Sequence, residues 1–90
     1  MFNPTRTTQF KRDVKQASKR GKNIKTIMAI MTKLAKGETL EPKHRDHKLS
    51  GDYVNHRECH IEPDWLLIYK IEKDIIVFVR TGTHSDLFKK

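Results

Sequence analysis

The sequence contains one cysteine, four glycines and three prolines among 90 residues. A single thiol, Cys59, excludes a disulfide framework and a zinc site built from thiolates, and it fits a reducing cytosol. No apolar run approaches the roughly 20 residues of a membrane-spanning helix. The polar start of the chain, residues 1–6, lacks the hydrophobic region of a secretory signal. We therefore expect a cytoplasmic protein with no membrane partner.

The sequence also lacks a nucleophilic serine or cysteine signature, internal repeats and low-complexity linkers. Ninety residues suffice for one modest hydrophobic core and are too few for two. We expect a single domain that spans residues 1–90.

Acidic residues are scarce in the first half of the chain. Residues 1–48 hold 13 Lys/Arg and four Asp/Glu, whereas residues 49–90 hold six and seven. The net charge of +8 therefore resides in the N-terminal half. A basic half on a small protein indicates a polyanionic partner, most often nucleic acid, although a solvated helix surface would have the same composition.

Two helices are predicted in this basic half. Apolar residues recur at helical spacing after a capping Thr7 or Thr8, and the first helix should end at Gly21. A second helix should follow the cap Asn23 and end at Gly37. The short connection between them predicts an αα-hairpin.

Three strands are predicted in the second half, after a loop over residues 38–51. Residues 56–61 alternate in polarity, residues 65–72 are apolar enough for a central strand buried on both faces, and residues 75–81 return after a tight turn. A final helical turn is expected over residues 85–88. The fold class is therefore α+β, with the N-terminal αα-hairpin packed on one face of a small antiparallel sheet. The opposite face should be open and polar.

A metal site is one interpretation of the five histidines. His56 and His60 share a strand face with Glu58, but at about 3.3 Å per residue the two imidazoles lie roughly 13 Å apart and cannot bind one ion. His44 and His47 lie in the loop and lack a third or fourth ligand nearby. We expect no metal ion and no other cofactor.

Metal-free cleavage of RNA is a better match. Histidine can take the proton of the ribose 2′-OH or protonate the departing 5′ oxygen, and the arginine fork fits phosphate oxygens. His60, Asp64, Arg80 and His84 lie at the ends of the predicted strands, where rigid elements would hold them. Each has an ordinary structural explanation on its own, and their joint occurrence favours chemistry.

The most specific segments form an ordered set: Asp46-His-Lys-Leu49 with Gly51, His60-Ile-Glu-Pro-Asp-Trp-Leu-Leu-Ile-Tyr-Lys70, Arg80-Thr-Gly-Thr-His84, and Leu87-Phe88. This set resembles the YafQ branch of the RelE/ParE superfamily, bacterial toxins from type II toxin–antitoxin modules. Phe10-Lys-Arg-Asp13 is similar to the first helix of that family. The resemblance implies two helices packed on an antiparallel sheet. It also implies a ribosome-dependent endoribonuclease that cuts mRNA in the decoding site.

The resemblance assigns roles to seven residues. His47, His60, Asp64 and His84 would form the acid–base set, Arg80 would stabilise the charged transition state, and Trp65 and Phe88 would position the substrate or shape the pocket. Lys48 is also expected to bind the substrate.

Within the acid–base set, His84 would be the general acid for the leaving 5′ oxygen, and the base stays open among the other three residues. Lys48 stands where the family commonly has a proline. His44 and His56 receive no role and are expected to be surface residues.

The resemblance also implies partners. An acidic, partly disordered segment of a cognate antitoxin would fold onto the basic surface, and the ribosome with its rRNA and mRNA would bind it as well. Operator DNA would be contacted only through the antitoxin complex. Two alternatives remain: a ParE-type toxin that binds DNA gyrase without cutting RNA, and a nucleic-acid-binding module that uses the basic helices. Neither would need the C-terminal histidines.

Overall fold

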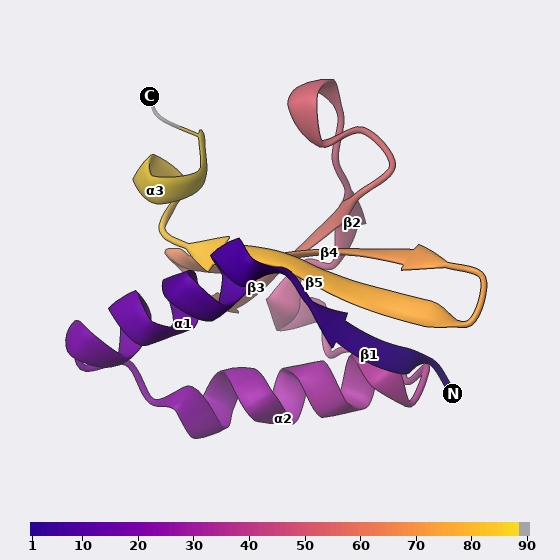
Figure 1. Ribbon diagram of the computed structural model, residues 1–90, viewed down its shortest axis with the longest axis horizontal. Helices are drawn as coiled ribbons and strands as arrows, with labels where there is room; N and C mark the ends of the chain where they lie inside the picture. Colours follow the sequence, from indigo (N-terminus) through magenta and orange to yellow (C-terminus); the bar gives the residue numbers. More distant parts are fainter. Residues whose placement is uncertain (89–90) are drawn as a thin grey trace.

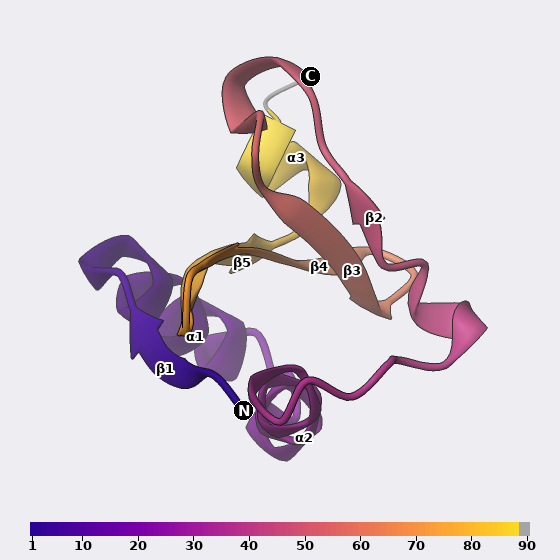
Figure 2. The ribbon, with the colours of Figure 1, turned by 90° about the vertical axis from the view of Figure 1, so that its right-hand side faces the viewer.

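The computed structural model describes residues 1–88. Five strands form one sheet in the order β1-β5-β4-β3-β2, and two long helices cover one face of it (Figures 1 and 2). The strands are β1 (Asn3–Arg6), β2 (His47–Lys48), β3 (Arg57–Glu62), β4 (Trp65–Glu72) and β5 (Ile75–Gly82). The helices are α1 (Thr8–Lys19), α2 (Ile24–Ala35) and the short α3 (His84–Phe88), with 3₁₀ turns η1 (Pro42–His44) and η2 (Gly51–Tyr53). None of the helices described is long and apolar enough to cross a membrane.

The predicted αα-hairpin is confirmed, including its ends. The Thr7 hydroxyl accepts the N–H of the third residue of α1 at 2.9 Å, and the Asn23 side chain caps α2 at 3.0 Å. Gly21 and Gly37 follow the two helices with φ of 84° and 78°, in the left-handed region that glycine adopts without strain.

The main core lies between these helices and the sheet. Phe10 of α1 and Ile27 of α2 are fully buried against Leu67, Ile76 and Phe78 of the central strands. Burial of such side chains contributes about 1.5–3 kcal/mol each. The apolar face of each helix therefore packs on the sheet, and the polar face is left to solvent.

Strand β1 was not predicted, and it makes the sheet mixed because it pairs with β5 in parallel. All four of its residues are exposed, so no alternation of polarity marks it in the sequence. Backbone hydrogen bonds hold it in place, and the Thr7 hydroxyl donates to the Val79 carbonyl at 2.8 Å.

Strand β2 lies inside the segment predicted as a loop. Its pairing with β3 sets His47 opposite Glu58. The start of β3 is Arg57 rather than residue 56, and His56 instead packs edge-on against Tyr53 with ring centroids 5.7 Å apart. Helix α3 begins at His84, one residue earlier than predicted.

The prediction that β4 is a central strand buried on both faces is confirmed. Leu66 and Ile68 point away from the main core and form a second cluster with Leu87 of α3. The expectation of an open polar face is therefore only partly correct. Glu58 and His60 do lie on that face, but Glu58 is 4% exposed because the surrounding segments cover it.

Candidate active site

Two histidines from neighbouring strands share one buried carboxylate. Oε1 of Glu58 lies 3.4 Å from Nε2 of His47 and 3.5 Å from Nε2 of His60. The Glu58 side chain is 6% exposed, and these two imidazoles are the ionisable groups that face its Oε1 atom. Alternation in the sequence placed Glu58 and His60 on one face, but gave Glu58 no role.

The His47 ring is held from both sides. Its Nδ1 lies 2.6 Å from the carbonyl oxygen of Arg45. Because a carbonyl only accepts hydrogen bonds, Nδ1 is the donor, and Nε2 faces Glu58. Strand β2 thereby presents the ring in a defined orientation.

His84 is paired with Asp64 across the sheet end. Asp64 lies in the turn between β3 and β4, and its Oδ1 accepts the backbone N–H of His84 at 2.9 Å and Nδ1 of the ring at 2.6 Å. The backbone hydrogen bond, followed by the side-chain one, lowers the pKa of Asp64. With Nδ1 engaged as a donor, Nε2 is the His84 atom that can exchange a proton with a ligand.

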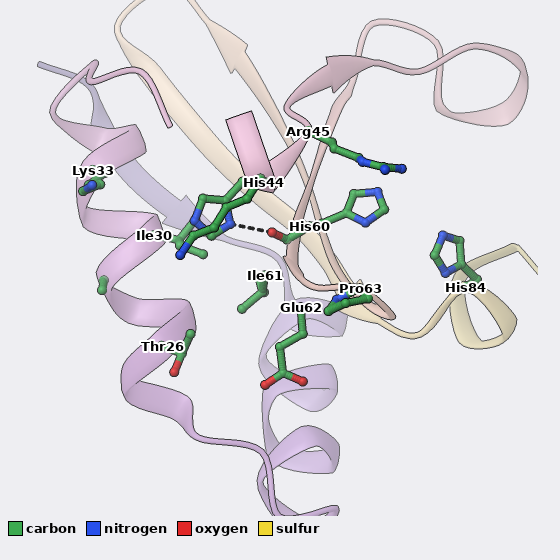
Figure 3. Close-up of a pocket in the computed structure, with 12 residues that line it drawn as sticks. Thr26, Ile30, Lys33, His44, Arg45, His60, Ile61, Glu62, Pro63 and His84 are labelled. Atoms are coloured by element: carbon green, nitrogen blue, oxygen red, sulfur yellow. Dashed lines mark hydrogen bonds between the residues drawn. The ribbon is translucent and has the colours of Figure 1, made fainter. Parts of the chain in front are cut away.

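The three imidazoles form a row. The ring centroids of His60 and His84 are 5.7 Å apart with the planes at 63°, and those of His47 and His60 are 6.4 Å apart. Figure 3 shows the His60 and His84 rings projecting from β3 and α3 at one end of a cleft. This spacing allows two imidazoles to reach the same phosphodiester.

A capping box fixes the start of α3, where His84 stands. Thr83 and Asp86 bond each other reciprocally at 3.0 and 3.1 Å, backbone to side chain. Arg20, the C-cap residue of α1, donates two hydrogen bonds to the Asp86 carboxylate at 2.6 and 3.3 Å. This arginine first, and the Thr83 N–H second, lower the pKa of Asp86 to about 2. A Cβ at Gly82 would lie 3.0 Å from Asp86, which explains the glycine in this motif.

Phe88 packs beside this row of imidazoles. Its ring centroid lies 6.5 Å from that of His84 and 5.9 Å from that of Tyr53, the latter edge-on. The predicted pocket-shaping residue is thus in direct contact with the predicted general acid.

Arg80 and Trp65 do not line the cleft at the histidines. The Arg80 fork bonds the Asp13 carboxylate of α1 at 2.7 and 3.2 Å, and this contact is the main cause that raises the pKa of Arg80. Trp65 is 1% exposed in the main core, with the Lys22 ammonium 5.8 Å from its ring. Both residues border a separate cavity of about 180 Å³.

Lys48 also lies outside the histidine cleft. It is exposed on the edge strand β2 and borders a different groove, together with Arg57 and Lys70. The preceding residue, His47, lies beside His60, but the Lys48 side chain lies away from both rings.

The expectation that His44 is a plain surface residue is wrong. The η1 turn folds it inward, and its Nδ1 donates to the carbonyl oxygen of His60 at 2.7 Å. This contact joins residues 16 positions apart, in a segment without periodicity, so no sequence signal identified it. His44 braces the β3 backbone directly at His60.

A second unpredicted group anchors the segment before His47. The Tyr69 hydroxyl lies 2.7 and 2.8 Å from the two oxygens of Asp46, and Arg57 donates to the same carboxylate at 3.1 Å. Burial is the main cause that raises the pKa of Tyr69, so the phenol remains a donor.

No group of three or more His, Cys, Asp or Glu side chains within residues 1–88 converges as a set of metal ligands. Cys59 is fully buried, and burial raises the pKa of its thiol to about 12. A thiol in that state is neither a nucleophile nor a ready ligand.

Comparison with known proteins identifies relatives of this arrangement. The sequence profile of the family described as "Bacterial toxin of type II toxin-antitoxin system, YafQ" matches residues 2–89. The mRNA interferase toxin YafQ of Escherichia coli (strain K12) is 42% identical over 81 residues, covering 89% of this chain and 88% of that protein. In the crystal structure of the E. coli DinJ-YafQ complex, the matching chain has a TM-score of 0.90 at 38% identity, covering 98% of this chain and 99% of that one. A metal-bound toxin from Helicobacter pylori has a TM-score of 0.91 at 38% identity over 98% and 100%.

Proposed function

Because this chain belongs to the YafQ family of bacterial toxins from type II toxin–antitoxin systems, as its ordered motifs predicted, we propose that it is a ribosome-dependent mRNA interferase that cuts mRNA in the decoding site. The observation that carries the proposal is the His60–His84 pair, 5.7 Å apart at a cleft and with Nδ1 of His84 fixed by Asp64. Similarity to an E. coli mRNA interferase toxin supports the same activity.

The proposed reaction transfers one proton from the RNA to a base and one proton from an acid to the RNA. A base takes the proton of the ribose 2′-OH, and the 2′ oxygen attacks the adjacent phosphorus. The bond to the 5′ oxygen breaks, and Nε2 of His84 protonates that leaving group. The products are a 2′,3′-cyclic phosphate and a 5′-hydroxyl end. DNA, which lacks the 2′-OH, is not a substrate.

His60 is the stronger candidate for the base, with His47 beside it at a ring-centroid distance of 6.4 Å. Both rings face Glu58, which stabilises the imidazolium that forms when the base accepts its proton. Asp64 is a poor base at neutral pH because its pKa is lowered and its Oδ1 already accepts two hydrogen bonds from His84. Its role is to orient His84 and stabilise its charged form.

The remaining residues have supporting roles in this proposal. Arg80 stabilises the charge on phosphorus once its fork leaves Asp13 and turns from the neighbouring cavity toward the substrate phosphate. Phe88 positions the substrate beside His84, and Lys48 contacts the RNA backbone from the sheet edge. The buried Trp65 anchors the start of β4, directly after Asp64.

We also propose the partners that the family context suggests. The E. coli relative was crystallised with DinJ, and a cognate antitoxin with an acidic, partly disordered segment suits the basic N-terminal half of this chain. Ribosomal RNA and mRNA phosphates would bind the same basic surface in a salt-dependent manner. Operator DNA would be reached only through the antitoxin complex.

The test is induced expression of the wild type and of His84→Ala in bacteria, with mapping of mRNA 5′ ends. In-frame cuts in translated messages should accompany growth arrest, and purified His84→Ala should cleave about 10²–10⁴-fold more slowly. Arrest that persists in the variant without mRNA cuts would instead favour a toxin that binds a target such as DNA gyrase.

A metal-free reaction is tested separately with the purified toxin and programmed ribosomes. Since a relative from Helicobacter pylori is described as metal-bound, the protein should first be stripped with a chelator that is then removed, because ribosomes themselves need Mg²⁺. Unchanged cleavage after stripping is expected. Activity that returns only on addition of a transition metal would contradict the metal-free mechanism.

A further inference from the structure

A cleft of about 820 Å³ extends from the acid–base row toward α2 (Figure 3). One wall is formed by α2, and the other by the η1 segment and the end of β3. His60 and His84 lie at one end, so the cleft is continuous with the site where the proposed reaction occurs. Its volume is in the range of specific ligand sites.

The rim of this cleft is positively charged. Lys33 lies on α2, and Arg45 directly follows η1 on the opposite wall. Lys43 of η1 also lines the cleft and is paired with Glu41 at 3.7 Å. The carboxylate in the lining, Glu62, is paired with Lys22 at 2.8 Å. Cations on both walls with a neutralised acid produce a channel that attracts an anion.

The floor of the cleft is apolar. Ile30 of α2 and Ile61 of β3 are buried beneath it, and the ring of Pro63 closes it below His84. Phosphates can pair with the charged rim while the faces of the bases contact the apolar floor, which here is aliphatic rather than the aromatic platform of many single-strand sites. An extended acidic peptide could use the same rim and floor, but the cleft opens directly onto His60 and His84, where the proposed RNA cleavage occurs, and this favours RNA.

We propose that this cleft binds the single-stranded RNA on the 5′ side of the scissile phosphate. The inference rests on the proposed function, because His84 protonates the downstream 5′ oxygen and His60 lies at the upstream 2′-OH. Along the row the cleft continues beyond His60, where His44 bonds its carbonyl oxygen. The upstream nucleotides therefore leave the site past His60, with phosphates on Lys33 and Arg45.

The test measures binding of an uncleavable RNA, so it does not depend on the chemical step. The probe is a fluorescent single-stranded oligoribonucleotide with one 2′-deoxy nucleotide at the cleavage position, titrated at low salt. The cleft pair Lys33→Ala/Arg45→Ala should weaken binding about ten-fold. Lys70→Ala/Lys73→Ala, near the β4–β5 turn, outside the basic N-terminal half and equal in charge change, should weaken it by about two-fold or less.

Truncated probes give the direction. Removing the upstream flank should abolish the difference between the wild type and the cleft pair, whereas removing the downstream flank should preserve it. The proposal would be overturned if both double variants lost the same RNA affinity, or if the effect of the cleft pair depended on the downstream flank. It would also be overturned if the wild type bound no RNA. If the cleft pair weakened the binding of an acidic peptide and left RNA binding unchanged, the cleft would be assigned to a protein partner instead.

The two proposals fail in different ways. A protein that shows the upstream coupling but does not cut programmed ribosomes retains the RNA site and loses the enzymatic function. A protein that cuts them but shows no coupling retains the function and loses the cleft assignment. Thermal unfolding of each double variant verifies that the fold is intact.

Discussion

The Tyr69 hydroxyl lies 2.7 and 2.8 Å from the two carboxylate oxygens of Asp46, the residue immediately before His47. Tyr69 belongs to the central strand β4 and is 1% exposed, so it is rigidly placed. The backbone at Asp46 is thereby tied to the core of the sheet. The short strand β2, with only two residues, would otherwise hold His47 weakly.

Tyr69→Phe keeps the ring in the core and removes only this hydroxyl. We expect the cleavage rate on programmed ribosomes to fall about ten-fold with little change in ribosome affinity, because His47 is less well oriented. The free energy of unfolding should fall by about 1 kcal/mol. If Tyr69 acts through His47, the Tyr69→Phe substitution should cost nothing further in a His47→Ala background. Additive losses would show that the hydroxyl acts elsewhere.

Glu58→Gln tests the carboxylate that His47 and His60 share. The amide keeps the shape of the side chain and removes the charge that faces both Nε2 atoms. We expect cleavage to fall by about 10²-fold, because the imidazolium formed during the reaction loses its counter-charge. Glu72→Gln, on the exposed end of β4, is the matched control and should stay within about two-fold. Near-normal cleavage by Glu58→Gln would reduce Glu58 to a packing residue.

Asp64→Ala tests whether Asp64 is a base in the reaction or a residue that orients His84. Since the pKa of Asp64 is lowered by its hydrogen bonds to His84, we expect it to act only through that ring. The variant should cut at least about ten-fold more slowly, and the double variant with His84→Ala should match His84→Ala alone. Single-turnover cleavage rates provide the measurement. A further large loss in the double variant would mean that Asp64 transfers a proton itself.

The elements that could be predicted from the sequence are those with local signals. Caps, glycine stops and helical periodicity defined α1 and α2, and a continuous apolar run defined β4. The order of the His60 and His84 motifs identified two residues that the fold does bring together. Each of these signals is contained within one segment of the chain.

The features that were missed depend on contacts between distant segments. Strand β1 is polar and is held by backbone hydrogen bonds to β5, some 72 positions along the chain. The fork between Arg80 and Asp13 joins α1 to β5, and the inward position of His44 depends on a carbonyl of β3. A carboxylate or imidazole in a polar segment has no periodicity that reveals its partner. Only the assembled sheet defines these pairs.

The ion pair behind α3 makes a prediction about stability in acid. Arg20 and the Thr83 N–H lower the pKa of Asp86 to about 2, below the unfolded-state value of about 3.9. This carboxylate therefore stabilises the fold fully above about pH 5 and loses that contribution progressively as the pH falls through about 2, the pKa of the folded state. Because the Asp86 side chain is 31% exposed, solvent screening limits its contribution to the free energy of unfolding to about 1 kcal/mol.

Asp86→Asn should lower the free energy of unfolding by that amount at pH 7, and most of this deficit should disappear by pH 2, as measured by urea unfolding. Asp52→Asn, exposed in η2, is the control and should change nothing at either pH. A deficit of Asp86→Asn that persists at pH 2 would assign its effect to the cap geometry rather than to charge.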